Sequence, residues 1–124
     1  MTKRIVLQSI PYKSMRYPSL GDYFMSEDGD TLFIYVAEDD GIEPIPEFEQ
    51  QLILLHELTE YWLCQKDGVT IEQIDAFDLK PENQGDFEPG DLPDSPYREQ
   101  HRKAMIIEHM LAMFMGITDY GTIS

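Results

Sequence analysis

The sequence has little positive charge: 9 Lys and Arg residues stand against 24 Asp and Glu residues, a formal net charge of −15. A chain this acidic repels phosphate groups, so we expect no nucleic-acid partner. The sequence also has only one cysteine, Cys64. It therefore forms no intrachain disulfide, and its free thiol favours a reducing, cytoplasmic location.

Long apolar runs are also lacking. Near the N-terminus the apolar run Ile5-Val6-Leu7 is too short for the hydrophobic part of a secretory signal. No stretch approaches the ~20 apolar residues that span a bilayer. We therefore expect a soluble intracellular protein without a membrane segment.

The composition that remains is that of a folded protein, with 42% hydrophobic residues in 124, and it predicts a single domain over residues 1–124. Its charge is uneven, because residues 1–20 carry four basic side chains and no acidic one. We expect a basic, strand-rich part at 1–40 and a helical part at 44–116. The acidic remainder is interpreted as a solvated surface, with a mimic of DNA as the alternative.

Three segments have the composition of strands: residues 3–10, 23–25 and 31–37, rich in β-branched and aromatic residues. Asp28-Gly29 lies between the last two and supplies the positive φ of a tight turn, which predicts a hairpin. We expect a small, antiparallel three-stranded sheet.

The rest of the chain has helical patterns. Apolar residues recur every three or four positions over 47–65, and a second such pattern covers 97–115. Between them, Thr70-Ile71-Glu72-Gln73 is a capping box that begins a short helix. Residues 80–96 contain four prolines, two glycines and five acids, a composition typical of a loop. The predicted fold is α+β, with the sheet packed on two long helices and one short helix.

The first long helix carries the segment His56-Glu57-Leu58-Thr59-Glu60. His56 and Glu60 are four residues apart, so both side chains lie on one helix face and can reach one cation. Glu57 follows His56 as the glutamate follows the first histidine of H-E-x-x-H metalloenzymes, where it takes a proton from water. His56 and Glu60 are thus candidate ligands, and Glu57 is a candidate catalytic base.

The second long helix supplies the remaining candidates. His101 and Glu108 interrupt an otherwise apolar stripe, and buried polar groups need partners. If the helices pack side by side, His56, Glu60 and His101 can converge as the two-nitrogen, one-oxygen ligand set of catalytic zinc sites. Glu108 lies two turns from His101 and is expected to accept the free N–H of a ligating imidazole.

Other residues are interpreted as structural. We expect His109 to face solvent and Cys64 to be a small buried side chain. Met105, Met110, Met113 and Met115 point around the whole circumference of the second long helix. A helix that is apolar on several sides favours coverage by a second copy, and so a homodimer.

These residues also carry a resemblance. The segment Leu54 to Glu60, the acidic loop Glu88-Pro89-Gly90-Asp91 and the segment from Pro96 to Ala104 resemble small phage- and prophage-associated proteins of uncharacterised function with a zincin-like metallohydrolase site. The resemblance covers roughly 47–116 and implies Glu57 as the base and His101 as the completing ligand. This sequence has Glu60 where zincins carry a second histidine.

The function predicted from these residues is that of a zinc-dependent hydrolase, a minimal metallopeptidase acting on a peptide or protein. The acidic 80–96 loop would favour a cationic substrate. The alternative is a non-catalytic acidic module that binds a protein partner, either with a structural metal or as a DNA mimic.

Overall fold

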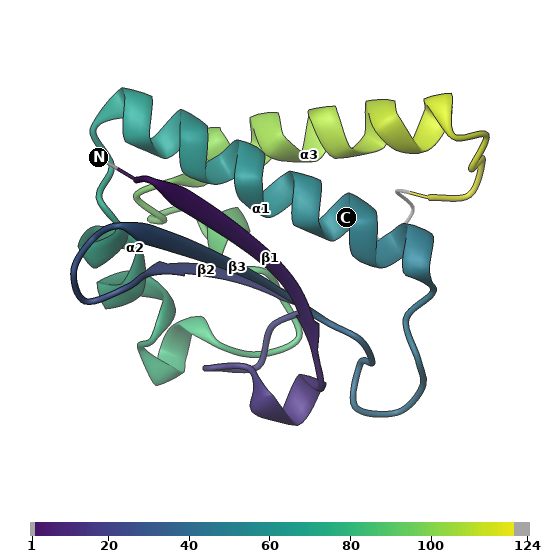
Figure 1. Cartoon of the computed structure of the whole chain (residues 1–124), viewed down its shortest axis with the longest axis horizontal. Coiled ribbons are helices and arrows are strands. Elements are labelled where there is room, and N and C mark those ends of the chain that lie inside the picture. Colours follow the sequence, from purple (N-terminus) through teal and green to yellow (C-terminus); the bar gives the residue numbers. More distant parts are fainter. Residues whose placement is uncertain (1, 121–124) are drawn as a thin grey trace.

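The computed structural model describes residues 2–120. It is an α+β fold in which a three-stranded sheet lies on a layer of helices (Figure 1). The elements, in chain order, are β1 (Arg4–Ile10), η1 (Tyr12–Ser14), β2 (Gly21–Met25), β3 (Thr31–Ala37), α1 (Glu47–Asp67), α2 (Ile71–Asp78), η2 (Pro81–Asn83), η3 (Pro89–Asp91) and α3 (Arg98–Phe114).

The sheet is mixed, with the strand order β1-β3-β2. The predicted hairpin is confirmed, because β2 pairs antiparallel with β3 and Gly29 in the turn has a φ of 75°. The prediction of an antiparallel sheet is wrong for β1, which pairs parallel to β3 over Arg4–Ile10. The most apolar strand, β3, takes the centre, and the more polar β1 takes an edge where its backbone is open to water.

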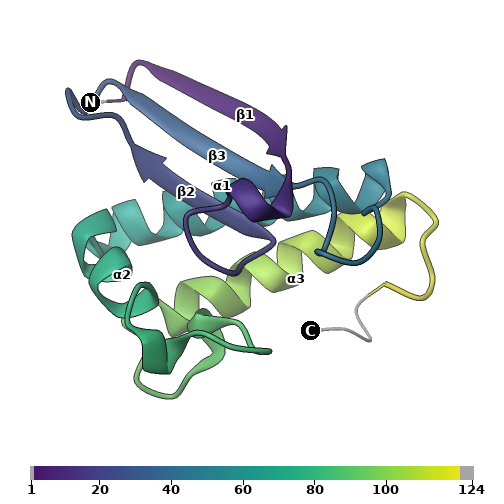
Figure 2. The same ribbon diagram turned by 90° about the horizontal axis from the view of Figure 1, so that it is seen from below.

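The helices α1 and α3 lie side by side, and α1 also covers one face of the sheet (Figure 2). Leu32, Ile34 and Val36 alternate along β3, so they share one face of the sheet, and all three are fully buried. Leu52 and Cys64 of α1 are fully buried as well, as predicted for Cys64. The two long helices therefore meet along their buried faces, which is the arrangement that brings His56, Glu60 and His101 within reach of one another.

The short elements are defined by local chemistry. Gly68 ends α1 in the left-handed conformation, with φ 78°, which a glycine adopts at little cost. Thr70 then caps α2: its hydroxyl accepts from the Gln73 N–H, and the Gln73 side chain accepts from the Thr70 N–H. The predicted loop of 80–96 contains only the short turns η2 and η3.

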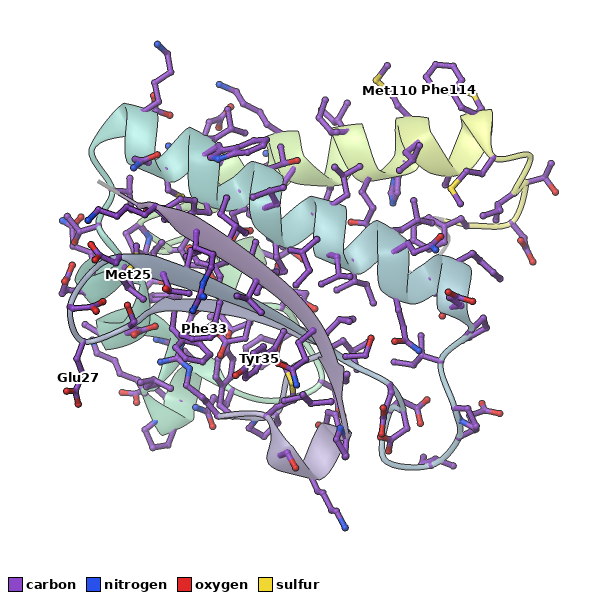
Figure 3. The ribbon with its side chains drawn as sticks, in the orientation of Figure 1. Met25, Glu27, Phe33, Tyr35, Met110 and Phe114 are labelled. Atoms are coloured by element: carbon purple, nitrogen blue, oxygen red, sulfur yellow. The ribbon has the colours of Figure 1, made fainter. Side chains whose placement is uncertain are left out.

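The outer face of α3 is apolar and exposed. Met110 and Phe114 point away from the rest of the molecule (Figure 3), and Phe114 is 75% exposed. Ile106, Ile107 and Met113 are also exposed along this helix. Among the helices of residues 2–120, none combines the length and the hydropathy needed to cross a membrane.

Candidate metal centre

Helix α1 presents three polar side chains toward α3 and the sheet. His56 and Glu60, one turn apart, are 7% and 4% exposed. Glu57 lies beside them, with its Oε2 3.8 Å from His56 Nε2. As the four-residue spacing predicts, His56 and Glu60 lie on successive turns of one helix face and point toward the same place.

His101 comes to the same place from the first turn of α3 and is 4% exposed. Its Nδ1 lies 2.9 Å from Glu60 Oε2 and 3.2 Å from His56 Nε2. The distance from His56 Nε2 to Glu60 Oε2 is also 3.2 Å. Three potential ligand atoms from two helices thus form a small triangle within the protein.

The size of this triangle fits a zinc ion. Ligand atoms about 2.1 Å from a tetrahedral zinc are about 3.4 Å apart, and the triangle has sides of 2.9 to 3.2 Å. Two imidazole nitrogens and one carboxylate oxygen are also a donor set that zinc accepts, with a fourth position left for water or substrate. Within residues 2–120, this is the group of His, Cys, Asp and Glu side chains with the spacing of a metal site.

Glu108 lies behind His56. His56 Nδ1 donates to Glu108 Oε1 at 2.7 Å, and the hydroxyl of Tyr120 donates to Glu108 Oε2. This contact leaves His56 Nε2 facing Glu60 and His101. A carboxylate that accepts the proton of one ring nitrogen orients the other nitrogen, which is the usual arrangement around ligating histidines.

The charges of these groups are strongly coupled. Burial alone would lower the pKa of His56, but its hydrogen bonds with Glu108 and Glu60 outweigh burial and raise the pKa to about 11. Burial alone would raise the pKa of Glu60, but hydrogen bonds with His101 and His56 lower it to about 2. The carboxylates around the centre therefore favour protonation of His56, and the two rings favour ionisation of Glu60.

Glu57 lies at the edge of the centre, where its side chain is 13% exposed. Burial and the neighbouring charge of Glu60 raise the pKa of Glu57 well above its ordinary range. The backbone of β2 lies directly against it, because a Cβ on Gly21 would be 2.9 Å from Glu57 Cγ. Gly21 thus allows α1 to approach the sheet closely enough to hold Glu57 beside His56.

An open cleft of about 600 Å³ lies over the centre, and His56, Glu57 and His101 line its wall. Seven carboxylates line the cleft, whereas within residues 2–120 neither Lys nor Arg does: Asp40, Glu49, Glu57, Asp86, Glu88, Asp91 and Glu108. Tyr12, Phe87 and Tyr120 add aromatic surface. The cleft is therefore negatively charged, and its volume is large enough for several side chains of a bound ligand.

A second, smaller cavity of about 20 Å³ lies behind the centre and is lined by Glu57, Glu60 and Asp78. Its volume suits about one water molecule. Asp78 Oδ1 accepts from the hydroxyl of Tyr97 at 2.7 Å, and Asp78 Oδ2 accepts from Tyr17 at 3.3 Å. Burial raises the pKa of Asp78 to about 7, although the Tyr97 hydrogen bond opposes this.

Sequence reasoning missed several residues of the site. His109, expected to face solvent, is half-buried, lines the cleft and contacts the ring of Tyr120. Gly90 lies against His101, since a Cβ there would be 2.6 Å from His101 Cγ. Asp91 Oδ1 lies 3.4 Å from His101 Nε2. The only signal for the last two is Pro89-Gly90-Asp91, a composition typical of a tight turn, which does not say where the turn packs.

The chain was compared with protein-family models, with curated proteins and with solved structures, and no match was found.

Proposed function

We propose that this protein is a zinc-dependent hydrolase of zincin-like type, a minimal metallopeptidase, in which His56, Glu60 and His101 hold the metal. One observation carries the proposal: the three ligand atoms lie within 3.2 Å of one another, and two of the three residues line an open cleft. A closed structural site has no need of a cleft, whereas a catalytic site requires access for substrate.

Each polar side chain of the centre has a role in this proposal. A zinc ion held there would supply Lewis acidity, which polarises a carbonyl group and makes water more acidic. Glu57 accepts the proton of the attacking water, since its carboxylate is within 4 Å of a ligand atom and lines the cleft. Glu108 accepts from His56 Nδ1 and so keeps His56 Nε2 directed at the metal position.

The cleft favours a cationic substrate. Glu49 and Asp86 line it, and neither carboxylate forms a hydrogen bond or ion pair with a basic side chain of residues 2–120. Basic side chains of a peptide would therefore be attracted to these carboxylates and to the aromatic rings beside them. Cleavage of Lys-rich peptides should weaken as salt is added, because salt screens this attraction.

Zinc content tests the metal site. We expect purified wild type to retain one zinc ion per chain by elemental analysis, and His56→Ala and His101→Ala to lose it. His109→Ala is the matched control, because His109 lines the same cleft but stands outside the triangle. Stoichiometric zinc in both the His56 and His101 variants would refute the proposed ligands.

Turnover tests the base. Glu57→Gln keeps the shape of the side chain but accepts a proton poorly, so we expect zinc to be retained and peptide hydrolysis to fall by about 100-fold or more. The assay uses a pool of short Lys-containing peptides with the zinc-loaded protein. Unchanged turnover in this variant would exclude Glu57 from the reaction.

A non-catalytic module that binds a protein partner is the second candidate, and the exposed apolar face of α3 favours it. Phe114 and Met113 are 75% and 65% exposed, more than a monomeric surface usually gathers on one helix. Zinc retained by wild type without hydrolysis of any peptide in the pool would favour this alternative.

A further inference from the structure

One nitrogen of the candidate centre lacks a partner. His101 Nδ1 faces Glu60 and His56, whereas His101 Nε2 is fully buried and has no hydrogen-bond partner among residues 2–120. A buried, unsatisfied ring nitrogen costs free energy and calls for an explanation. Among residues 2–120, the carboxylate oxygen that lies closest to it is Asp91 Oδ1, at 3.4 Å.

Asp91 is brought there by the turn η3. Backbone hydrogen bonds from Asp91 to Glu88 and from Leu92 to Pro89 close the turn, and Leu92 packs against the hydrophobic core. Gly90 lies so close to the His101 ring that a Cβ would be 2.6 Å from His101 Cγ. The turn thus lies against the imidazole and holds a carboxylate next to its outer nitrogen.

A hydrogen-bonded form of this arrangement exists on the other side of the centre. Glu108 accepts from His56 Nδ1, which leaves His56 Nε2 for the metal position. Asp91 faces His101 Nε2, which leaves His101 Nδ1 for that position. A ligating imidazole keeps its second nitrogen protonated, and a carboxylate beside that nitrogen sets the tautomer and the direction of the ring.

We propose that Asp91 is a positioning residue of the metal centre: its carboxylate accepts the Nε2–H of His101 and presents His101 Nδ1 to the ion. This inference rests on the proposed function, because it assigns a role relative to the metal. Asp91 is not part of the core, since its side chain is 46% exposed. Its removal should therefore weaken the metal centre and leave the folding of the metal-free chain unchanged.

Zinc affinity, measured by competition with a chromophoric chelator, tests the inference. We expect Asp91→Ala to bind zinc about 10- to 100-fold more weakly than wild type, and Asp91→Asn, which keeps an acceptor oxygen, to fall between them. Asp94→Ala is the matched control, because it removes the same charge from an exposed position of the same 80–96 loop and should stay close to wild type. Thermal unfolding of the metal-free proteins should not distinguish Asp91→Ala from wild type.

A second measurement reports on the ring itself. In NMR spectra of the zinc-loaded wild type, His101 should carry its proton on Nε2, and the Nε2–H resonance should move upfield in Asp91→Asn. Wild type that binds zinc together with an Asp91→Ala variant of equal affinity would overturn the role of Asp91 and leave the proposed function intact. Wild type that binds no zinc at all would overturn both.

Discussion

Two glycines control how closely the backbone approaches the candidate centre. Gly21 of β2 lies against Glu57, and Gly90 of η3 lies against His101. Neither has a positive φ, so each is required for space and not for backbone conformation. Gly21 contacts the proposed base and Gly90 contacts a proposed metal ligand. Substitutions at the two glycines can therefore test the two roles separately.

Replacement of these glycines by alanine should have different effects. Gly90→Ala should displace the His101 ring and weaken zinc binding, whereas Gly21→Ala should displace Glu57, keep zinc and lower turnover by roughly 100-fold. Both variants should lose about 1–3 kcal/mol of unfolding free energy, because the new methyl group overpacks the interface. Chelator competition, peptide hydrolysis and urea unfolding measure the three effects. Equal zinc affinity in Gly90→Ala and wild type would contradict the steric argument.

Asp78 makes stability depend on pH. Its pKa is raised from 3.8 to about 7 in the folded state, chiefly by burial, so the folded state binds the extra proton between these values. The unfolding free energy of wild type should therefore fall as the pH rises from about 4 to 7. Asp78→Asn imitates the protonated side chain and should remove this part of the slope.

Urea unfolding at pH 4, 6 and 8 measures the difference between Asp78→Asn and wild type. The variant should be close to wild type at pH 4 and more stable by a few kcal/mol, in order of magnitude, at pH 8. Asp94→Asn, at an exposed position, serves as the control for lost charge. A variant less stable than wild type at pH 8 would show that the ionised Asp78 is the favourable form.

At the scale of elements, local signals define the helices on either side of Gly68. The 3.6-residue periodicity places His56 and Glu60 on one face of α1, and the capping box starts α2 at Ile71. These features depend on neighbours within four residues. Helix α2 in turn carries Asp78 to its place behind the centre.

Removal of the Thr70 cap should therefore lower the stability of the fold. Thr70→Ala deletes the hydroxyl that accepts from the Gln73 N–H and should reduce the unfolding free energy by about 1 kcal/mol, whereas Thr70→Ser should retain most of it. Thermal and urea unfolding measure the change. Equal stability of the alanine and serine variants would mean that the cap contributes nothing.

At the scale of the whole molecule, a strong negative charge and an exposed apolar face oppose each other. The net charge of −15 repels a second copy, while the outer face of α3 offers Met110 and Phe114 for burial. The expected homodimer through this face should thus be weak at low salt and strengthen as salt screens the repulsion. Binding of a cationic peptide in the cleft should change with salt in the opposite sense.

Sedimentation velocity at low and high NaCl concentration tests self-association. Wild type should shift from the 14.4 kDa monomer toward the dimer as salt rises, and the double variant Met110→Gln with Phe114→Gln should remain monomeric. Ile42→Gln is the control, since Ile42 is 94% exposed in a different part of the fold. Wild type that stays monomeric at every salt concentration would refute the homodimer.

The sequence by itself determined the features that depend on near neighbours. Periodicity predicted both long helices and the shared face of His56 and Glu60, and Asp28-Gly29 predicted the β2–β3 hairpin. The apolar surroundings of His101 also predicted that it is buried. In each of these cases the deciding interaction lies within one turn of helix or one tight turn of chain.

Only the tertiary structure decided what depends on distant segments. It placed β1 parallel to β3, because a strand can pair with its neighbour in either direction and the path of the whole chain decides which. It also brought His101 to His56 and laid Gly90 and Asp91 against His101. The 80–96 loop has no periodic pattern, so its path depends on the surfaces against which it packs. Those surfaces come from segments distant in the sequence, and the local sequence of the loop does not predict them.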